Sequence, residues 1–176
     1  MLEVRNVTKR FGGIVALNDV SLRVERGERI AIVGPNGSGK TTLFNVISGV
    51  YKPDVGRVLF EGIDITDLPA YRRAHLGIAR AFQIPRPFPN LTVRENVAVG
   101  ALFGSLYGRI GVREALEIAD EKLKLVGLYE KRLEIAGKLT VPELKLLELA
   151  RALASKPKLL LLDEIVAGMP PSLVDH

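Results

Sequence analysis

The sequence predicts an α/β fold in which a sheet core is interrupted by helices. Apolar residues mostly alternate with polar ones over residues 2–33, which is typical of short strands. A glycine-rich segment, 34–39, separates the last of these expected strands from an amphipathic helix at 40–48. The continuous apolar run at 159–162 is of the kind found in buried parallel strands. The two ends of the chain are therefore expected to share one sheet core.

Strands are expected wherever the apolar pattern has a period of two, at 20–24, 29–33, 57–61 and 78–82. The segment 40–48 instead places its apolar residues on one helical face. Gly49 and the nearby Pro53 are stop signals that end this helix.

Three prolines, Pro85, Pro87 and Pro89, mark a border after the strand at 78–82, because each lacks a backbone N–H and biases its predecessor toward extended conformations. Beyond them, apolar residues recur at helical spacing in 112–126 and 144–153. We therefore predict three segments: 1–86 as the first part of the core, 87–155 as a helical subdomain, and 156–176 as an incomplete second part of the core.

Composition excludes several classes of protein. The 176 residues suit one domain, and 47% hydrophobic with 26% charged residues is ordinary globular usage. There is no cysteine, so disulfide scaffolds, thiol catalysis and cysteine zinc sites are excluded. No apolar stretch has the roughly 20 residues that a transmembrane helix needs, and we find no signal peptide. The net charge of +5 is spread along the chain and indicates a solvated surface more than a dedicated partner.

A phosphate-binding loop is the strongest motif in the chain. The segment follows the pattern Gly, four residues, Gly-Lys, then Ser or Thr, between an expected strand and an expected helix. Its residues are Gly34, Pro35, Asn36, Gly37, Ser38, Gly39, Lys40, Thr41 and the following Thr42. Glycines let successive N–H groups face one anion, and the helix dipole points to the same place. Lys40 is expected to reach the β- and γ-phosphates, and the Thr41 hydroxyl to coordinate Mg²⁺.

Two acids after the leucine run complete such a site. Asp163 and Glu164 stand at the carboxyl end of the expected strand 159–162, where α/β sheets bind ligands. Asp163 is expected to hold the metal, directly or through water, and Glu164 to activate a water molecule as general base. An Asn-Lys-x-Asp motif, which would select guanine, is absent from the sequence, so ATP is the expected nucleotide.

Together these motifs resemble the nucleotide-binding subunit of ABC transporters, and the resemblance covers essentially the whole chain. It implies a RecA-like P-loop NTPase core with an N-terminal antiparallel β subdomain and an inserted helical subdomain. Phe11 matches the aromatic residue that stacks on adenine in this family, although a core phenylalanine is the alternative. Gln83 matches the glutamine that touches the metal and water and senses the membrane partner. The stretch 82–97 looks most like ATPases that drive branched-chain amino-acid uptake.

The family's signature segment, usually Leu-Ser-Gly-Gly-Gln, aligns with Leu139-Thr140-Val141-Pro142-Glu143. In the family it contacts the γ-phosphate bound by the opposite subunit. Pro142 has no N–H to donate, and Glu143 brings a negative charge toward phosphate. We therefore expect an impaired signature, and a heterodimer with a second ATP-binding subunit whose signature is intact.

The other departure from the family follows Glu164. The resemblance implies a further strand between the two motif-bearing strands and then a histidine, neither of which is present, and His176 is too close to Glu164 to be that histidine. We expect a fragment that lacks the final strands of the core.

Three functions fit these observations. The first is an ATPase subunit on the cytoplasmic face of the cell membrane, bound to the transmembrane permease subunits of an uptake transporter for branched-chain or related amino acids. The second is a soluble ABC-type ATPase acting on nucleic acid or ribosomes, although no second cassette or basic linker favours nucleic acid. The third is a truncated remnant that binds nucleotide without hydrolysis.

Overall fold

A computed structural model describes residues 1–105 and 107–163 of the chain. The described residues fall into two compact units, 1–73 and the described part of 74–176, and each unit is presented by itself. The borders expected from the sequence after residues 86 and 155 stay a prediction.

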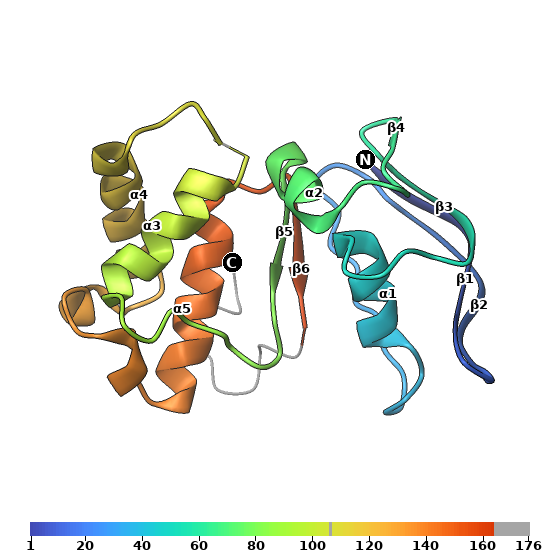
Figure 1. Ribbon diagram of the computed structural model, residues 1–176, viewed down its shortest axis with the longest axis horizontal. Helices are drawn as coiled ribbons and strands as arrows, with labels where there is room; N and C mark the ends of the chain where they lie inside the picture. Colours follow the sequence, from blue (N-terminus) through green and yellow to red (C-terminus); the bar gives the residue numbers. More distant parts are fainter. Residues whose placement is uncertain (106, 164–176) are drawn as a thin grey trace. The chain divides into compact units, whose positions relative to one another are not determined.

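The first unit contains a four-stranded antiparallel sheet in the order β2-β1-β3-β4 (Figure 1). Its strands are β1 (Leu2–Phe11), β2 (Ile14–Val24), β3 (Val55–Phe60) and β4 (Ile63–Asp64). Val4 of β1 lies opposite Leu22 of β2 and Val58 of β3. The strands expected near 20–24 and 57–61 are therefore confirmed, and the N-terminal subdomain is antiparallel.

The core of this first unit is formed by apolar side chains that alternate with exposed ones along its strands. Leu2, Val4 and Val7 of β1 and Val58 and Phe60 of β3 are all at most 2% exposed. Helix α1 (Lys40–Ser48) has the bounds that the sequence predicts, and it buries Leu43, Val46 and Ile47. Gly49 ends the helix in the left-handed conformation, with φ 81°. Helix α2 (Ala70–Leu76) begins in this unit and continues across the boundary to the second.

The strand expected at 29–33 is wrong, because the structure assigns no regular secondary structure there. Ile30 is 47% exposed and Val33 89% exposed. An alternating sequence becomes a strand only where a neighbouring strand accepts its backbone hydrogen bonds. Within the described part of the chain, no strand pairs with 29–33.

In the second unit, β5 (Ile78–Ala81) and β6 (Leu159–Leu162) form a parallel pair, with Ile78 opposite Leu159 and Ala81 opposite Leu162. The strands expected near 78–82 and at 159–162 are therefore confirmed. The expectation that the leucine run is buried on both faces is wrong for Leu162, which is 42% exposed. Among the described residues β6 has only β5 as a neighbour, so one edge carries no ladder.

Three helices form the rest of the second unit: α3 (Val93–Phe103), α4 (Val112–Leu125) and α5 (Val141–Ala154) (Figure 1). Short 3₁₀ turns at Tyr129–Lys131 (η1) and Ala136–Lys138 (η2) connect α4 to α5. The helices share one buried apolar cluster that includes Val97, Ala119 and Leu147. At Gly100 of α3 an added Cβ would lie 2.2 Å from the backbone oxygen of Arg151, so α3 and α5 meet at van der Waals contact. The helices predicted from periodicity near 112–126 and 144–153 are confirmed.

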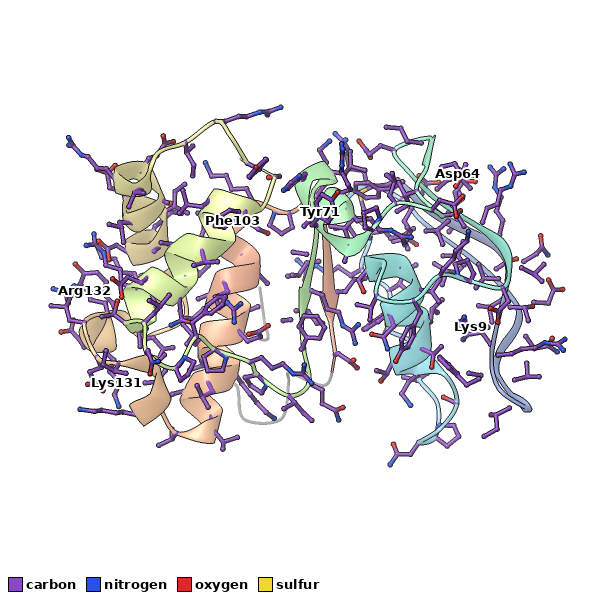
Figure 2. The ribbon with its side chains drawn as sticks, in the orientation of Figure 1. Lys9, Asp64, Tyr71, Phe103, Lys131 and Arg132 are labelled. Atoms are coloured by element: carbon purple, nitrogen blue, oxygen red, sulfur yellow. The ribbon has the colours of Figure 1, made fainter. Side chains whose placement is uncertain are left out.

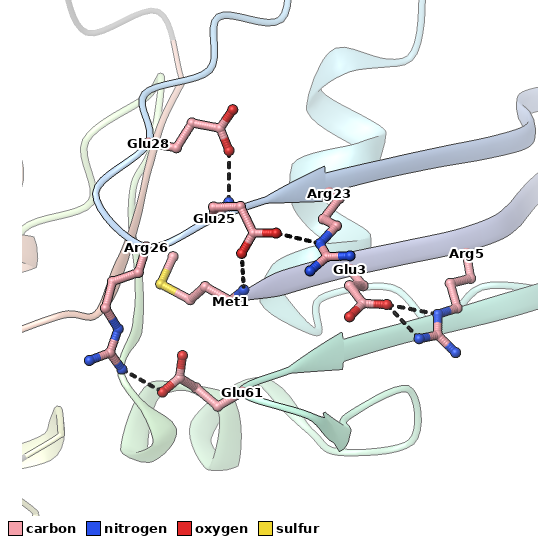
Figure 3. A network of polar contacts seen from close by, with 8 residues as sticks. All are labelled: Met1, Glu3, Arg5, Arg23, Glu25, Arg26, Glu28 and Glu61. Carbon is pink, nitrogen blue, oxygen red and sulfur yellow. Dashed lines mark hydrogen bonds and ion pairs between the residues drawn. The ribbon is translucent and has the colours of Figure 1, made fainter.

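Many charged side chains are paired on the surface. In the first unit Glu25 contacts both the N-terminal amine and Arg23, and Arg26 reaches Glu61 at 2.8 Å (Figure 3). Such exposed pairs add little stability, but they agree with a solvated surface as the explanation of the net charge. Among the described residues, no helix combines the length and the apolar character that a membrane crossing requires.

Candidate functional site

The glycine-rich loop that follows residue 33 curls back on itself. The amide of Ser38 donates to the carbonyl of Pro35 at 3.2 Å, and Gly37 and Gly39 have φ angles of 81° and 92°. A side chain at Gly39 would place its Cβ 2.5 Å from the backbone oxygen of Ala16. Only glycine fits that position, because both the conformation and the space exclude a Cβ.

The loop leads into the N-terminus of α1, where no side chain caps the free backbone N–H groups. Gly39 is the N-cap of α1 and offers no side-chain hydrogen bond, and the first turn contains no acid. By contrast, Thr92 and Glu95 form a capping box at the start of α3. The first amides of a helix need an acceptor, so the N-terminus of α1 can take an anion.

Lys40 lies over the same loop. Its ammonium group donates to the backbone oxygens of Gly34 at 2.7 Å and Pro35 at 2.8 Å. These two bonds hold the positive charge on the loop that the anion would contact. Thr41 is exposed and Thr42 half-buried in the first turn of α1. Residues 34–42 thus lie together around the N-terminus of α1, and their role in binding a nucleotide stays a prediction.

Phe11 closes β1 in the same unit and is 41% exposed. Its ring packs edge-on against Tyr51, with centroids 5.1 Å apart, and the Lys9 ammonium lies 5.5 Å from its centroid. Figure 2 labels Lys9, which also pairs with Asp54. A half-exposed ring is not the ordinary core phenylalanine that was the alternative, and it offers a face for stacking.

Gln83 and Asp163 belong to the second unit, where they follow the carboxyl ends of β5 and β6. Because Ala81 is opposite Leu162 in this parallel pair, both residues come at one edge of the small sheet. Gln83 is exposed in a loop, whereas Asp163 is 6% exposed. The carboxylate of Asp163 accepts a 2.7 Å hydrogen bond from Arg80. Glu164, the expected general base, lies outside the described residues.

Helix α5 holds the loop around Gln83 through two charged side chains. Burial raises the pKa of Glu148, while the charge of Arg151 and hydrogen bonds with the backbone of Phe82 and Arg86 act in the opposite direction. Arg151 contacts Glu148 at 3.0 Å and donates to the backbone oxygen of Arg86 at 2.9 Å. Glu148 and Arg151 therefore hold the backbone on both sides of Gln83 in the sequence. Sequence reasoning missed this pair, although a Glu and an Arg three residues apart on an apolar helix were a signal for it.

Comparisons with known proteins agree with this geometry. The ABC transporter family model matches residues 17–167. The chain belongs to the ABC transporter family. A probable branched-chain amino acid transport ATP-binding protein, LivG, of Archaeoglobus fulgidus is 43% identical over 98% of this chain and 70% of its own length. BraF of Pseudomonas aeruginosa, a high-affinity branched-chain amino acid transport ATP-binding protein, is 38% identical over 99% of this chain and 73% of its length.

Solved ABC cassettes share the fold. A nucleotide-free ATP-binding cassette from an ABC transporter has a TM-score of 0.82 at 40% identity and covers 98% of this chain, which spans 72% of that protein. A dimeric cassette in a post-hydrolysis state, bound to ADP and Pi, has a TM-score of 0.88 at 31% identity, with 99% of this chain and 78% of that chain covered. This ABC transporter subunit is therefore a P-loop ATPase of a family whose cassettes bind ATP or ADP and form dimers.

The segment 139–143, which we align with the family's signature, caps its own helix end. One oxygen of the Glu143 carboxylate accepts from both the amide and the hydroxyl of Thr140, each at 2.8 Å. The other oxygen pairs with Lys131 at 2.6 Å. The hydrogen bond with Lys131, followed by those with Thr140, lowers the pKa of Glu143 to about 2. Figure 2 labels Lys131, whose ammonium group pairs with Glu143 at this end of α5.

Arg73 is a second residue that sequence reasoning missed. It is 1% exposed and donates to backbone oxygens at the C-terminal end of α1 and in the connection to α2. Its acceptors are Val46 at 2.7 Å and Ile47, Leu68 and Thr66 at 2.9 Å each. Arg73 therefore anchors the helix whose first residues form the candidate phosphate site.

Two of the expected metal ligands, one in each unit, carry oxygen donors of the kind that Mg²⁺ takes. Among the described residues, no three His, Cys, Asp or Glu side chains gather into a metal cluster. Mg²⁺ is commonly held by one or two carboxylates together with substrate phosphates and water. The exposed Thr41 hydroxyl and the Asp163 carboxylate are donors of that kind.

Proposed function

We propose that this chain binds ATP with Mg²⁺ and hydrolyses it to drive amino-acid uptake. The observation that carries the proposal is the folded loop of residues 34–41, with an uncapped helix end and Lys40 bonded across it. This arrangement supplies N–H donors and one fixed positive charge, which is what a polyphosphate requires. Gly37 and Gly39 allow the curl through their positive φ angles, and Gly34 leaves room for the Ser38 side chain. Phe11 offers a half-exposed ring to the adenine base.

The residue roles follow from their chemistry. Thr41 and Asp163 would hold Mg²⁺, with Gln83 as a further contact for the metal and the attacking water. When bound, the metal neutralises phosphate charge during transfer. Lys40 stabilises the charge that develops on the γ-phosphate oxygens, and Glu164 accepts a proton from the attacking water. The products are ADP and inorganic phosphate.

The names of the relatives support a proposal for the solute and the location. Their names describe branched-chain amino acid transport, and we propose branched-chain or related amino acids as the solute. Transmembrane permease subunits would then be the partners, and they would hold this chain at the cytoplasmic face of the membrane. The loop of residues 82–88, fixed on α5 by Glu148 and Arg151, is suited to pass movement between a permease and the nucleotide.

We also propose that the working dimer pairs this chain with a different ATP-binding subunit. The amide and the hydroxyl of Thr140, the N-cap of α5, already donate to the Glu143 carboxylate, which Lys131 holds in place. A helix end whose N-cap donors are already bonded to its own carboxylate has fewer free donors for a phosphate of an opposite subunit. The phosphate loop of this chain would face the intact signature of its partner and form the competent site.

Turnover of radiolabelled ATP tests the reaction. The unmodified chain, mixed with the partner subunit, should release phosphate in the presence of Mg²⁺, and Glu164→Gln should keep ATP binding while it loses release. Uptake of leucine into vesicles that contain the permease subunits tests the solute. ATP binding without any phosphate release would refute the hydrolysis, and rapid turnover by a homodimer of this chain would refute the heterodimer.

A further inference from the structure

One buried ion pair in the second unit joins the carboxyl ends of its two parallel strands. Arg80 on β5 donates through Nη2 to Oδ2 of Asp163, which directly follows β6, at 2.7 Å. The side chains are 4% and 7% exposed. Asp163 is the residue proposed above as a metal ligand, so the role inferred for Arg80 rests on that proposed function.

Arg80 is held in place independently of the carboxylate. Its backbone belongs to the β5 ladder, where it is opposite Leu161. Its guanidinium carbon lies 4.6 Å from the centroid of the Phe82 ring, a cation–π contact. Phe82 immediately precedes Gln83, so the same guanidinium touches both the acid and the loop expected at the metal. A guanidinium fixed in this way is placed to stay beside Asp163 whether or not a metal is bound.

The charges at this position have a definite consequence. A buried carboxylate without a counter-charge is strongly unfavourable, and Arg80 provides that charge when no metal is present. A divalent cation at the same carboxylate is repelled by the guanidinium at short range. We propose that Arg80 acts through Asp163: its guanidinium neutralises the Asp163 carboxylate when no metal is bound, and it thereby weakens the binding of Mg²⁺ to that carboxylate.

The direction of the effect separates this role from a structural one. If Arg80 only oriented the carboxylate, its loss would weaken Mg²⁺ binding about 10- to 100-fold, as removal of groups next to metal ligands does. As a competing cation, it has the opposite effect: its loss strengthens Mg²⁺ binding, by about tenfold or more. The stabilised metal-free state also favours release of the metal with ADP after turnover.

The test measures binding of fluorescent ADP while Mg²⁺ is titrated, with two variants that separate charge from shape. Arg80→Gln keeps an N–H donor for Asp163 and removes the charge, and Arg80→Lys keeps the charge and loses the planar stack on Phe82. Half-maximal Mg²⁺ should fall about tenfold or more in Arg80→Gln and stay within about threefold in Arg80→Lys. An unchanged or higher requirement in Arg80→Gln overturns the proposal.

Two further measurements keep the outcome clear. In an Asp163→Asn background, Arg80→Gln should change the Mg²⁺ requirement little, because the carboxylate on which it acts is gone. If Arg80→Gln is unstable without metal, Mg²⁺ with ADP should raise its Tm more than that of the unmodified chain; an equal or smaller rise contradicts the proposal. Failure of the unmodified chain to bind ADP would refute the proposed function itself, whereas ADP binding with the wrong direction in Arg80→Gln refutes only the role of Arg80.

Discussion

Replacing Arg73 with methionine removes the clamp at the end of the phosphate-binding helix. The guanidinium uses four hydrogen bonds to tie α1 to the segment before α2. Two of the acceptors, Val46 and Ile47, are among the last carbonyls of α1, which lack the usual donor four residues further along the helix. The amide of Gly49 also donates to the Val46 oxygen, at 3.3 Å. Methionine fills similar space and leaves all four buried oxygens without this donor.

The structure sets the size of the loss. Burial lowers the pKa of Arg73 from 12.5 to about 10, so bringing the charge inside opposes folding by about 3 kcal/mol. Hydrogen bonds from a charged donor contribute about 1.5 kcal/mol each at the low end of their range, or about 6 kcal/mol for the four. The difference predicts that Arg73→Met destabilises the chain by about 3 kcal/mol.

Urea unfolding followed by circular dichroism measures this loss, and hydrogen exchange of α1 amides locates it. Arg72→Met is the matched control, because Arg72 is the neighbouring arginine and is exposed; it should change stability by less than about 0.5 kcal/mol. Arg73→Lys should not restore stability, since one ammonium cannot reach four acceptors. A loss below about 1 kcal/mol for Arg73→Met, or unchanged exchange in α1, would show that Arg73 does not anchor this helix.

Three other changes test the phosphate loop, the capping box of α5, and the contacts that Glu148 and Arg151 make with the loop of residues 82–88. Gly39→Ala should abolish ADP binding because its Cβ would lie 2.5 Å from the Ala16 oxygen, whereas Gly13→Ala, with nothing within 4 Å, should leave calorimetric binding intact. The pKa of Glu143 is lowered from 4.5 to about 2, so its contribution to stability is present above pH 4.5 and lost as pH falls toward 2. The Tm difference between the unmodified chain and Glu143→Gln should therefore shrink over that interval, and a constant difference would contradict the ion pair with Lys131. Glu148→Gln should speed hydrogen exchange of residues 82–88 about tenfold, since it removes a charged partner from their backbone. Unchanged exchange would show that Glu148 does not hold this loop on α5.

Local signals in the sequence were enough for the phosphate-binding loop and its helix. Glycine positions, the change from strand to helix period, and the stop at Gly49 are all encoded within residues 34–49, so α1 was predicted with its bounds. The prediction of a strand at 29–33 was wrong, because an alternating pattern shows only that the segment is compatible with a strand. Its formation depends on a hydrogen-bonding neighbour elsewhere in the chain.

The residues that position the site could not be found in this way. Arg80 and Asp163 are 83 positions apart, and the acceptors of Arg73 extend back to Val46. No spacing rule joins such residues; only the folded chain does. Glu143 was different, because Thr140 with Glu143 is a capping-box pattern that can be read from sequence. From its charge alone we expected Glu143 to face the phosphate of an opposite subunit. In the structure its carboxylate instead bonds to Thr140 at the start of its own helix and to Lys131.

Calorimetric binding of ATP in the presence of Mg²⁺ is the most direct test of the central claim, that the loop at 34–41 binds a nucleotide. Lys40→Ala should lower the affinity at least about 100-fold, because it removes the charge fixed over the loop. Lys52→Ala removes an exposed lysine of the same unit and should bind as the unmodified chain does. Equal affinity in Lys40→Ala and Lys52→Ala would contradict the account.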